Sequence, residues 1–166
     1  MGGLHGSHVA ELTTGMQLSM LLYNQNQFSS GRAKAPIRLL VVDDAHETTQ
    51  VLRSSLESGF FEVIEACSGE QGLAQARHAE PDMIVVDLVT AETAGLEFCR
   101  ELRRFSKTLI LLLSANGKPG VTEQAFDEGV DDFLTKPTNS SILVASVYKL
   151  ARRSQPEVEP PRNSGM

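Results

Sequence analysis

The stretch Met83-Ile84-Val85-Val86-Asp87 decides the fold that this sequence predicts. Four apolar residues in a row, two of them valine, are typical of a short strand that is covered on both faces in a parallel sheet. A Pro-Asp turn precedes the stretch and marks where the strand begins. Asp87 then stands at the carboxyl end of the strand, which is the edge of an open α/β sheet where ligands bind.

A second apolar stretch has the same design. Residues 37–42, Ile-Arg-Leu-Leu-Val-Val, are followed by Asp43 and Asp44. If both strands end at the same edge, the three carboxylates gather there, and neighbouring carboxylates disfavour one another's ionised form. A bound cation relieves this repulsion, and because all the ligands would be oxygen atoms the pattern favours Mg²⁺.

Apolar stretches and amphipathic segments alternate along the chain. Strands are predicted at residues 37–42, 60–65, 83–87, 108–113 and 132–134. Helices are predicted at residues 45–56, 70–78, 96–104, 120–128 and 140–152. This alternation predicts an α/β fold, a doubly wound five-stranded parallel sheet with helices on both faces. The buried face of the last helix is predicted to hold Ile142, Leu143, Val147 and Leu150.

Composition narrows the class of protein. A net charge of −6 over 166 residues argues against a nucleic-acid-binding surface, so no nucleic-acid partner is expected. Cys67 and Cys99 are far apart and form no CxxC motif, which indicates free thiols and a cytoplasmic protein. Cys99 is expected to face the core and Cys67 to lie in a loop. No apolar run approaches the roughly 20 residues of a membrane span, so no membrane is expected.

The two ends of the chain differ from its centre. Residues 1–36 are predicted to form an extension and linker, either disordered or carrying a short amphipathic helix, and isolated short helices are marginal in water. Residues 154–166 are rich in proline and are predicted to be a disordered tail. The domain itself is therefore expected over residues 37–153.

The residues at the strand ends resemble the receiver domain of bacterial two-component response regulators. Asp43-Asp44 is similar to the acidic pair of that family, and Asp87 to its phosphoacceptor. Further along the chain, in the family's order, come its loop glycine, small hydroxyl residue, switch aromatic and Lys-Pro pair, at Gly95, Ser114, Phe133 and Lys136-Pro137. The resemblance implies a flavodoxin-like (βα)5 fold and a Lys-Pro peptide bond that is usually cis.

The resemblance implies a stand-alone phosphoacceptor of a phosphorelay. Such a protein is not an enzyme, although slow loss of its own phosphoryl group is compatible with this role. A histidine kinase or phosphotransfer protein would phosphorylate Asp87, and an unknown downstream protein would read the result. Mg²⁺ would be held by Asp44, Asp87 and the carbonyl of Val89, with Asp43 acting through water. Lys136 and Ser114 would contact phosphoryl oxygens. Ser114 and Phe133 would form the switch.

Some positions depart from the family pattern, and two other functions remain as alternatives. Thr90, Ala91 and Thr138 replace the family's usual Met-Pro and aromatic residues. A Mg²⁺-dependent phosphatase of the haloacid dehalogenase type also uses an aspartate nucleophile, but usually has a second aspartate where this chain has Val89. The other alternative is a pseudo-receiver that binds partners without being phosphorylated, and the complete set of site residues argues against it.

Overall fold

The five strands lie in one parallel sheet. The computed structural model describes residues 35–56, 59–89 and 93–154. The chain divides into two units between Ala35 and Pro36, and the fold below is that of the second. The strand order is β2-β1-β3-β4-β5. Their bounds are β1 Ile37–Asp43, β2 Phe61–Ala66, β3 Met83–Asp87, β4 Leu109–Ser114 and β5 Asp132–Thr135.

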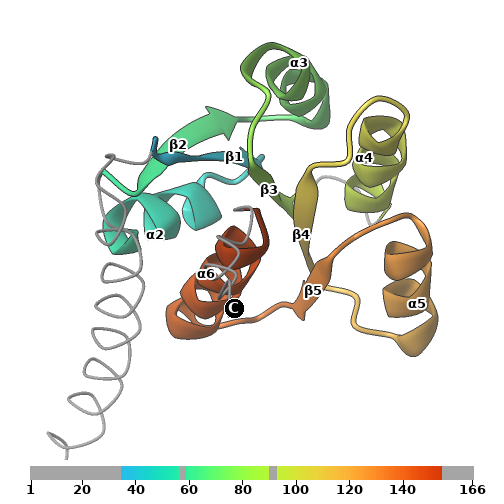
Figure 1. Cartoon of the computed structure of the whole chain (residues 1–166). Helices are drawn as coiled ribbons and strands as arrows, with labels where there is room; N and C mark the ends of the chain where they lie inside the picture. The colour runs from blue at the N-terminus through green and yellow to red at the C-terminus, as the bar shows by residue number, and fades with distance from the viewer. Residues whose placement is uncertain (1–34, 57–58, 90–92, 155–166) are drawn as a thin grey trace, which may run out of the picture. The chain divides into compact units, whose positions relative to one another are not determined.

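Five helices in the described unit cover the sheet on both faces. Their bounds are α2 Glu47–Ser55, α3 Gly69–Ala79, α4 Ala94–Arg103, α5 Pro119–Asp127 and α6 Ser140–Ser154. Helices α2 and α6 lie on one face, and α3, α4 and α5 lie on the other (Figure 1). The predicted doubly wound α/β fold is confirmed. Among the residues that the structure describes, no helix has the length and apolar character needed to cross a membrane.

Strand β3 is the centre of the sheet, as its sequence predicted. All five of its residues are buried, and Met83 to Val86 are fully enclosed. Burying side chains of this kind contributes about 1.5–3 kcal/mol each. Its neighbour β1 is in register with it, so that Asp43 stands beside Asp87. The two acidic strand ends therefore meet at one edge of the sheet.

Two helices begin two residues away from their predicted starts, and α3 and α5 begin one residue earlier than predicted. Helix α2 begins at Glu47 rather than at residue 45, because His46 has a φ of 64° and this left-handed backbone cannot continue a helix. Helix α4 begins at Ala94, so Gly95 lies in its first turn rather than in the preceding loop. A Cβ at Gly95 would lie 2.8 Å from Leu112 Cδ1, so glycine allows α4 to approach β4 closely.

The predicted buried face of α6 was wrong at one residue. The side chain of Ile142 is 49% exposed, whereas Leu143, Val147 and Leu150 are buried as predicted. Ile142 precedes Lys149 by seven residues and so shares the outer face of the helix with it. The buried stripe is completed instead by Val144, Tyr148 and Ala151.

Several other predictions have a definite outcome. Cys99 is buried and Cys67 is exposed, as expected. The Lys136–Pro137 peptide bond is cis, as the resemblance implied. The predictions for the N-terminal extension and the C-terminal tail fall on residues 1–34 and 155–166, which lie outside the described residues, as do Thr90 and Ala91.

Candidate functional site

The carboxylate of Asp87 lies buried at the carboxyl end of β3, and both of its oxygens accept hydrogen bonds. Its side chain is 2% exposed. Lys136 Nζ donates to Asp87 Oδ1 at 2.9 Å and to Oδ2 at 3.1 Å. Thr48 Oγ1 donates to Oδ2 at 2.6 Å. A buried charge is tolerated only when it is paired and hydrogen-bonded, and these donors meet both conditions.

Lys136 reaches Asp87 from the far side of β4. It directly follows β5, the edge strand, and its backbone N–H donates to Ser114 O at 2.8 Å. This bond extends the pairing of β4 and β5 by one residue and aims the lysine side chain across β4 toward β3. The side chain is 27% exposed, so the ammonium group remains accessible from solvent.

Asp43, one strand away, is directed at the start of α2. It is fully buried. Its Oδ1 accepts from Ala45 N at 3.0 Å, and its Oδ2 accepts from Thr49 N at 3.0 Å and Thr49 Oγ1 at 3.3 Å. The N-cap residue of α2, His46, makes no side-chain cap, so Asp43 supplies the acceptor that the first turn needs.

Asp44 joins the loop after β1 to the loop after β3. Both of its carboxylate oxygens accept from Val89 N at 3.1 Å. The peptide of Val89 is therefore held beside the acidic pair, and its side chain is 53% exposed. Each of the three predicted acids thus has hydrogen-bond donors of its own, and these donors already offset part of the expected repulsion.

These residues form a suitable donor set for Mg²⁺. Asp44 and Asp87 offer carboxylates, and Val89 offers a main-chain carbonyl, from two loops that follow neighbouring strands. All are hard oxygen donors, which Mg²⁺ prefers. Because Lys136 contacts both oxygens of Asp87, an ion that binds Asp87 must share that carboxylate with the ammonium group.

The two predicted switch residues lie close to the site without touching Asp87. Ser114 Oγ accepts from Asn116 N at 3.2 Å and donates to Asn116 O at 3.5 Å, so its described hydrogen bonds stay within its own loop. Phe133 is half-buried and packs against the core cluster that includes Leu112, its partner across the strands. The structure therefore places Ser114 at the site and Phe133 behind it.

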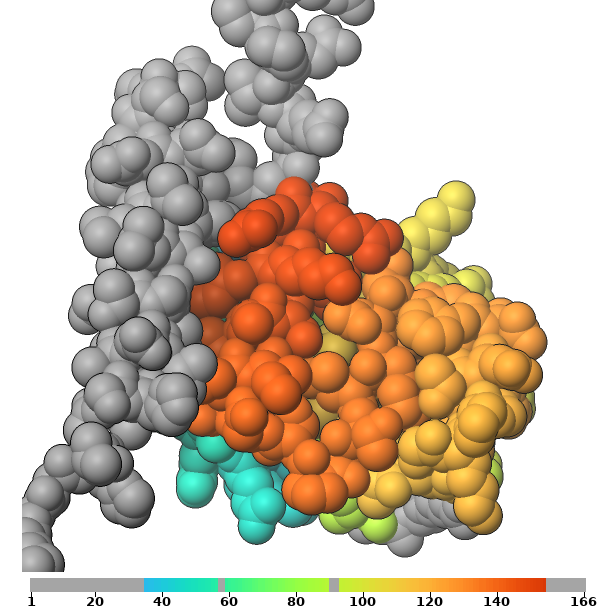
Figure 2. Space-filling view, turned by 90° about the horizontal axis from the view of Figure 1, so that it is seen from below, coloured from blue at the N-terminus to red at the C-terminus, as the bar shows by residue number. Residues whose placement is uncertain are grey.

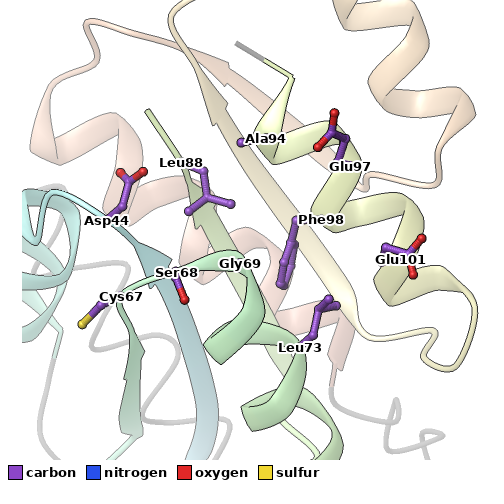
Figure 3. A pocket seen from close by; sticks show the side chains of 10 residues that line it. All are labelled: Asp44, Cys67, Ser68, Gly69, Leu73, Leu88, Ala94, Glu97, Phe98 and Glu101. Carbon is purple, nitrogen blue, oxygen red and sulfur yellow. The ribbon is translucent and has the colours of Figure 1, made fainter. Parts of the chain in front are cut away.

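Two hollows flank the loop after β3. One has a volume of about 590 Å³ and opens beside the phosphoacceptor candidate; it is lined by Asp87, Leu88, Val89 and residues 113–118. The other has a volume of about 300 Å³ and is lined by Asp44, Cys67, Ser68, Leu88 and residues of α3 and α4 (Figure 3). Leu88 lines both hollows, and the first provides a small donor molecule with a route to Asp87.

Sequence reasoning missed Thr48. Its side chain is 6% exposed and donates to Asp87, although it lies 39 residues away in sequence. A signal was present in the sequence, because Thr48, Leu52 and Leu56 are spaced four residues apart and so share one face of a helix. In the structure all three are buried. The apolar stripe of α2 thus begins one turn earlier, with a hydroxyl in the position nearest the site.

Cys99 is excluded as a nucleophile by its surroundings. Burial raises the pKa of its thiol to about 12, and the nearby Arg103 lowers that pKa only in part. A thiol with such a pKa is almost entirely protonated at neutral pH and reacts poorly.

Comparisons with known proteins agree with this arrangement. The family model described as the response regulator receiver domain matches residues 39–148. The chain is 35% identical over 117 residues to the transcriptional regulatory protein ResD of Bacillus subtilis, covering 70% of this chain and 49% of ResD. It is 34% identical over 122 residues to the KDP operon transcriptional regulatory protein KdpE of Escherichia coli, covering 74% of this chain and 54% of KdpE. The chain spans about half the length of these curated relatives.

Solved structures show the same fold. The receiver domain of the Francisella response regulator 1452 superposes with a TM-score of 0.64 at 26% identity, covering 71% of this chain and 98% of that one. The Vibrio cholerae chemotaxis protein CheY4 superposes with a TM-score of 0.61 at 28% identity, covering 70% of this chain and 99% of that one. Both likenesses extend over nearly the whole of the known domain.

Proposed function

The chain belongs to the family of response regulator receiver domains, and from this premise we propose that Asp87 is its phosphoacceptor, phosphorylated by a histidine kinase or a phosphotransfer protein. Receiver domains of this family are phosphoacceptor signalling modules of two-component systems. The observation that carries the assignment to Asp87 is its buried carboxylate, held by Lys136 and Thr48 at the carboxyl end of the central strand.

In the proposed reaction, Asp87 is the nucleophile. A carboxylate oxygen forms a bond to phosphorus while the bond from phosphorus to the donor breaks, and the donor's leaving atom keeps the electron pair and takes up a proton. Phosphoryl transfer depends mainly on positioning and on neutralising charge. The 590 Å³ hollow beside Asp87 leaves room for the donor.

Lys136 changes partner during this reaction. Before transfer, its ammonium group lies 2.9 Å from Asp87 Oδ1. Once the carboxylate has become an acyl phosphate, the negative charge has moved outward onto the phosphoryl oxygens, and the flexible lysine side chain follows it. The Ser114 hydroxyl turns away from Asn116 to donate to another phosphoryl oxygen.

Thr48 is a positioning residue in this proposal. Its hydroxyl donates to Asp87 Oδ2 from the first turn of α2, whose backbone is tied to Asp43. The orientation of the nucleophilic carboxylate is therefore set from both sides, by Thr48 and by Lys136. A fixed orientation lowers the entropy that must be lost on reaching the transition state.

Receiver domains of this family generally bind Mg²⁺ at the phosphorylation site, and the donor set of this chain fits the ion. Asp44, Asp87 and the carbonyl of Val89 would hold it directly, and Asp43 would contact it through water. The bound ion supplies positive charge to the phosphoryl oxygens. Asp43 has a second duty, since its hydrogen bonds to Thr49 also set the position of α2.

The proposed output is a change in partner binding. When Ser114 turns toward the phosphoryl group, space opens for Phe133 to bury its ring further. The surface formed by α5, β5 and α6 would then change shape; Figure 2 views the molecule from a side on which residues of both α5 and α6 are exposed. Phe126 of α5 and Ile142 of α6 are 48% and 49% exposed and offer apolar contacts for a downstream protein.

Two narrower parts of the proposal concern what this chain does not do. The relatives named above are transcriptional regulators, yet the −6 charge of this chain still predicts no nucleic-acid binding of its own. Hydrolysis in the manner of a phosphatase is disfavoured because Val89, and not a second aspartate, stands two residues after Asp87.

The proposal is tested by incubating the full chain with acetyl phosphate and Mg²⁺ and measuring its intact mass. We expect one phosphoryl group on the unaltered chain and none on Asp87→Asn. Thr122→Val, which alters a hydroxyl of α5 away from Asp87, is the matched control and should be phosphorylated normally. Equal labelling of Asp87→Asn would show that the acceptor lies elsewhere.

A further inference from the structure

A second group of potential ligands lies at the same edge of the sheet, outside the phosphoacceptor site. The ligand atoms of His46, Glu65 and Cys67 all lie within 4.8 Å of one another. They are a nitrogen, a carboxylate oxygen and a sulfur. We propose that these three residues bind a borderline-soft divalent cation, with Zn²⁺ as the best fit, at a site distinct from the proposed Mg²⁺ site.

Two of the ligands are brought together by the strand itself. Glu65 lies in β2, and Cys67 follows one residue after the strand ends at Ala66. Residues two apart in an extended chain point to the same side, so both side chains face the α2 side of the sheet. Cys67 also lines the 300 Å³ hollow, and in Figure 3 its sulfur is directed away from Leu88 and Phe98.

The third ligand is placed by an unusual backbone conformation. His46 is one of two residues other than glycine with a positive φ among the described residues, and its φ is 64°. This conformation is uncommon for a residue with a side chain. It turns the imidazole toward β2, where Nδ1 forms a close hydrogen bond with Glu65 Oε1. A cation can replace the shared proton between these two atoms.

Neighbouring residues hold the ligands in place. Arg53 Nη2 lies 3.5 Å from Glu65 Oε2, which leaves Oε1 for the cation. The backbone N–H of Cys67 donates to Gln71 Oε1 at 2.9 Å, and Gln71 N in turn donates to Ser68 Oγ, the N-cap of α3. Contacts of this kind orient metal ligands and strengthen binding.

The donor chemistry selects the metal. A thiolate and an imidazole together favour Zn²⁺ over Mg²⁺ or Ca²⁺, which prefer oxygen alone. Bond lengths of about 2.0–2.3 Å place the ligands of a tetrahedral zinc ion roughly 3.3–3.7 Å apart. Since His46 and Cys67 are exposed, small side-chain rotations are enough to reach that spacing. Three protein ligands leave the fourth position for water.

The proposed site is tested by titrating the full chain with CoCl2 and then with ZnCl2, in excess MgCl2 to saturate the oxygen donors near Asp87. A cobalt ion bound by a thiolate gives a charge-transfer absorption band. We expect this band at one metal ion per chain and its loss on adding Zn²⁺. Cys99 is not a competing source, because its thiol is buried.

Substitutions assign the band to Cys67 and His46. Cys67→Ser and His46→Asn should abolish it, and asparagine tolerates the left-handed backbone at position 46. Arg53→Gln should weaken binding by about tenfold. His78→Gln and Glu62→Gln are matched controls, being an exposed histidine of α3 and an exposed glutamate of β2, and should leave the band unchanged. Circular dichroism confirms that each variant is folded.

Three results would overturn the site. The first is the absence of a thiolate band, and the second is a band that survives Cys67→Ser. The third is binding that disappears in a His5→Gln/His8→Gln chain, which would place the metal at the N-terminus. The test does not depend on phosphorylation, so it can succeed or fail independently of the role proposed for Asp87.

Discussion

A cation and a carboxylate are paired at each end of the sheet, and the two pairs are built differently. At the amino end, Arg103 donates to the carbonyls of Gly129, Thr108 and Ser106 as well as to Asp131. At the carboxyl end, Lys136 contacts only the two oxygens of Asp87 among its described side-chain hydrogen bonds. Both pairs are largely shielded from solvent.

The Arg103–Asp131 pair is a fixed connection, whereas the Lys136–Asp87 pair is an exchangeable one. The planar guanidinium of Arg103 divides its donors among three backbone carbonyls in two segments, and moving it would deprive these carbonyls of that donor. The ammonium of Lys136 is a point charge on a flexible stem, and it can follow a negative charge from carboxylate to phosphoryl group. The amino end of the sheet therefore holds the fixed pair, and the carboxyl end holds the residues that we propose carry the chemistry.

Removing the fixed connection should have the largest effect on stability. Arg103→Met leaves the Asp131 carboxylate and the backbone carbonyls short of donors, so we expect a loss of about 3 kcal/mol in the free energy of unfolding. Urea denaturation measures it. Arg104→Met is the matched control, because the Arg104 side chain is 74% exposed and should matter little. Equal losses for the two variants would contradict the comparison.

Breaking the exchangeable pair should cost less stability and abolish the switch. Lys136→Met leaves Asp87 with Thr48 alone, so we expect a loss of about 2 kcal/mol and no response to the phosphoryl group. The double variant Lys136→Met/Asp87→Asn should recover most of that stability, because the buried charge is gone. A double-mutant cycle with urea denaturation measures the coupling. Additive losses would show that the two side chains do not interact.

Removing the hydroxyl of Thr48 should slow phosphorylation without preventing it. Thr48→Val keeps the shape and loses the hydrogen bond to Asp87 Oδ2. We expect the rate with acetyl phosphate to fall roughly tenfold, the equivalent of one such bond. Thr48→Ser, which keeps the hydroxyl, should restore most of the rate. A slow rate in both variants would point to packing instead of positioning.

The smallest expected effect on stability comes from the thiol of Cys99, which lies near Arg103 of the fixed connection. Because the pKa of Cys99 is raised to about 12 from an ordinary 9.0, the folded state keeps its thiol neutral while the unfolded state ionises. The stability contribution is thus complete below pH 9 and declines as the pH rises toward 12. At pH 8 we expect iodoacetamide to modify Cys67 and to spare Cys99, as measured by peptide mass. Rapid modification of both in the native chain would show that this region opens.

The fold could be predicted where its cause is local in the sequence. The run of apolar residues in β3 and the acid that follows it gave the strand its observed bounds. The start of α2 could not be predicted in this way, because it depends on the left-handed backbone of His46. Ile142 was misplaced because an apolar residue at the edge of a helical stripe can face either side.

The sequence indicated the positions of most candidate site residues but not their hydrogen-bond contacts. Asp43, Asp44 and Asp87 were identified as acids at strand ends, and Ser114 and Lys136 through the resemblance to receiver domains. Each stands at or directly after the end of a strand, at one edge of the sheet. Which donor satisfies which carboxylate depends on side chains that are distant in sequence. Thr48 shows this, since its contact with Asp87 forms only when α2 packs on the sheet and brings its first turn to the end of β3.

The span of chain that meets at Asp87 has a consequence for the order of assembly. Thr48 comes 39 residues before Asp87, and Lys136 comes 49 residues after it. During synthesis, the proposed nucleophile Asp87 therefore emerges from the ribosome long before Lys136, which can reach it only when the edge strand has joined the sheet. Contacts over such separations form late in folding. An unfinished chain would thus not react with phosphodonors, and only a chain with a completed sheet could take part in signalling.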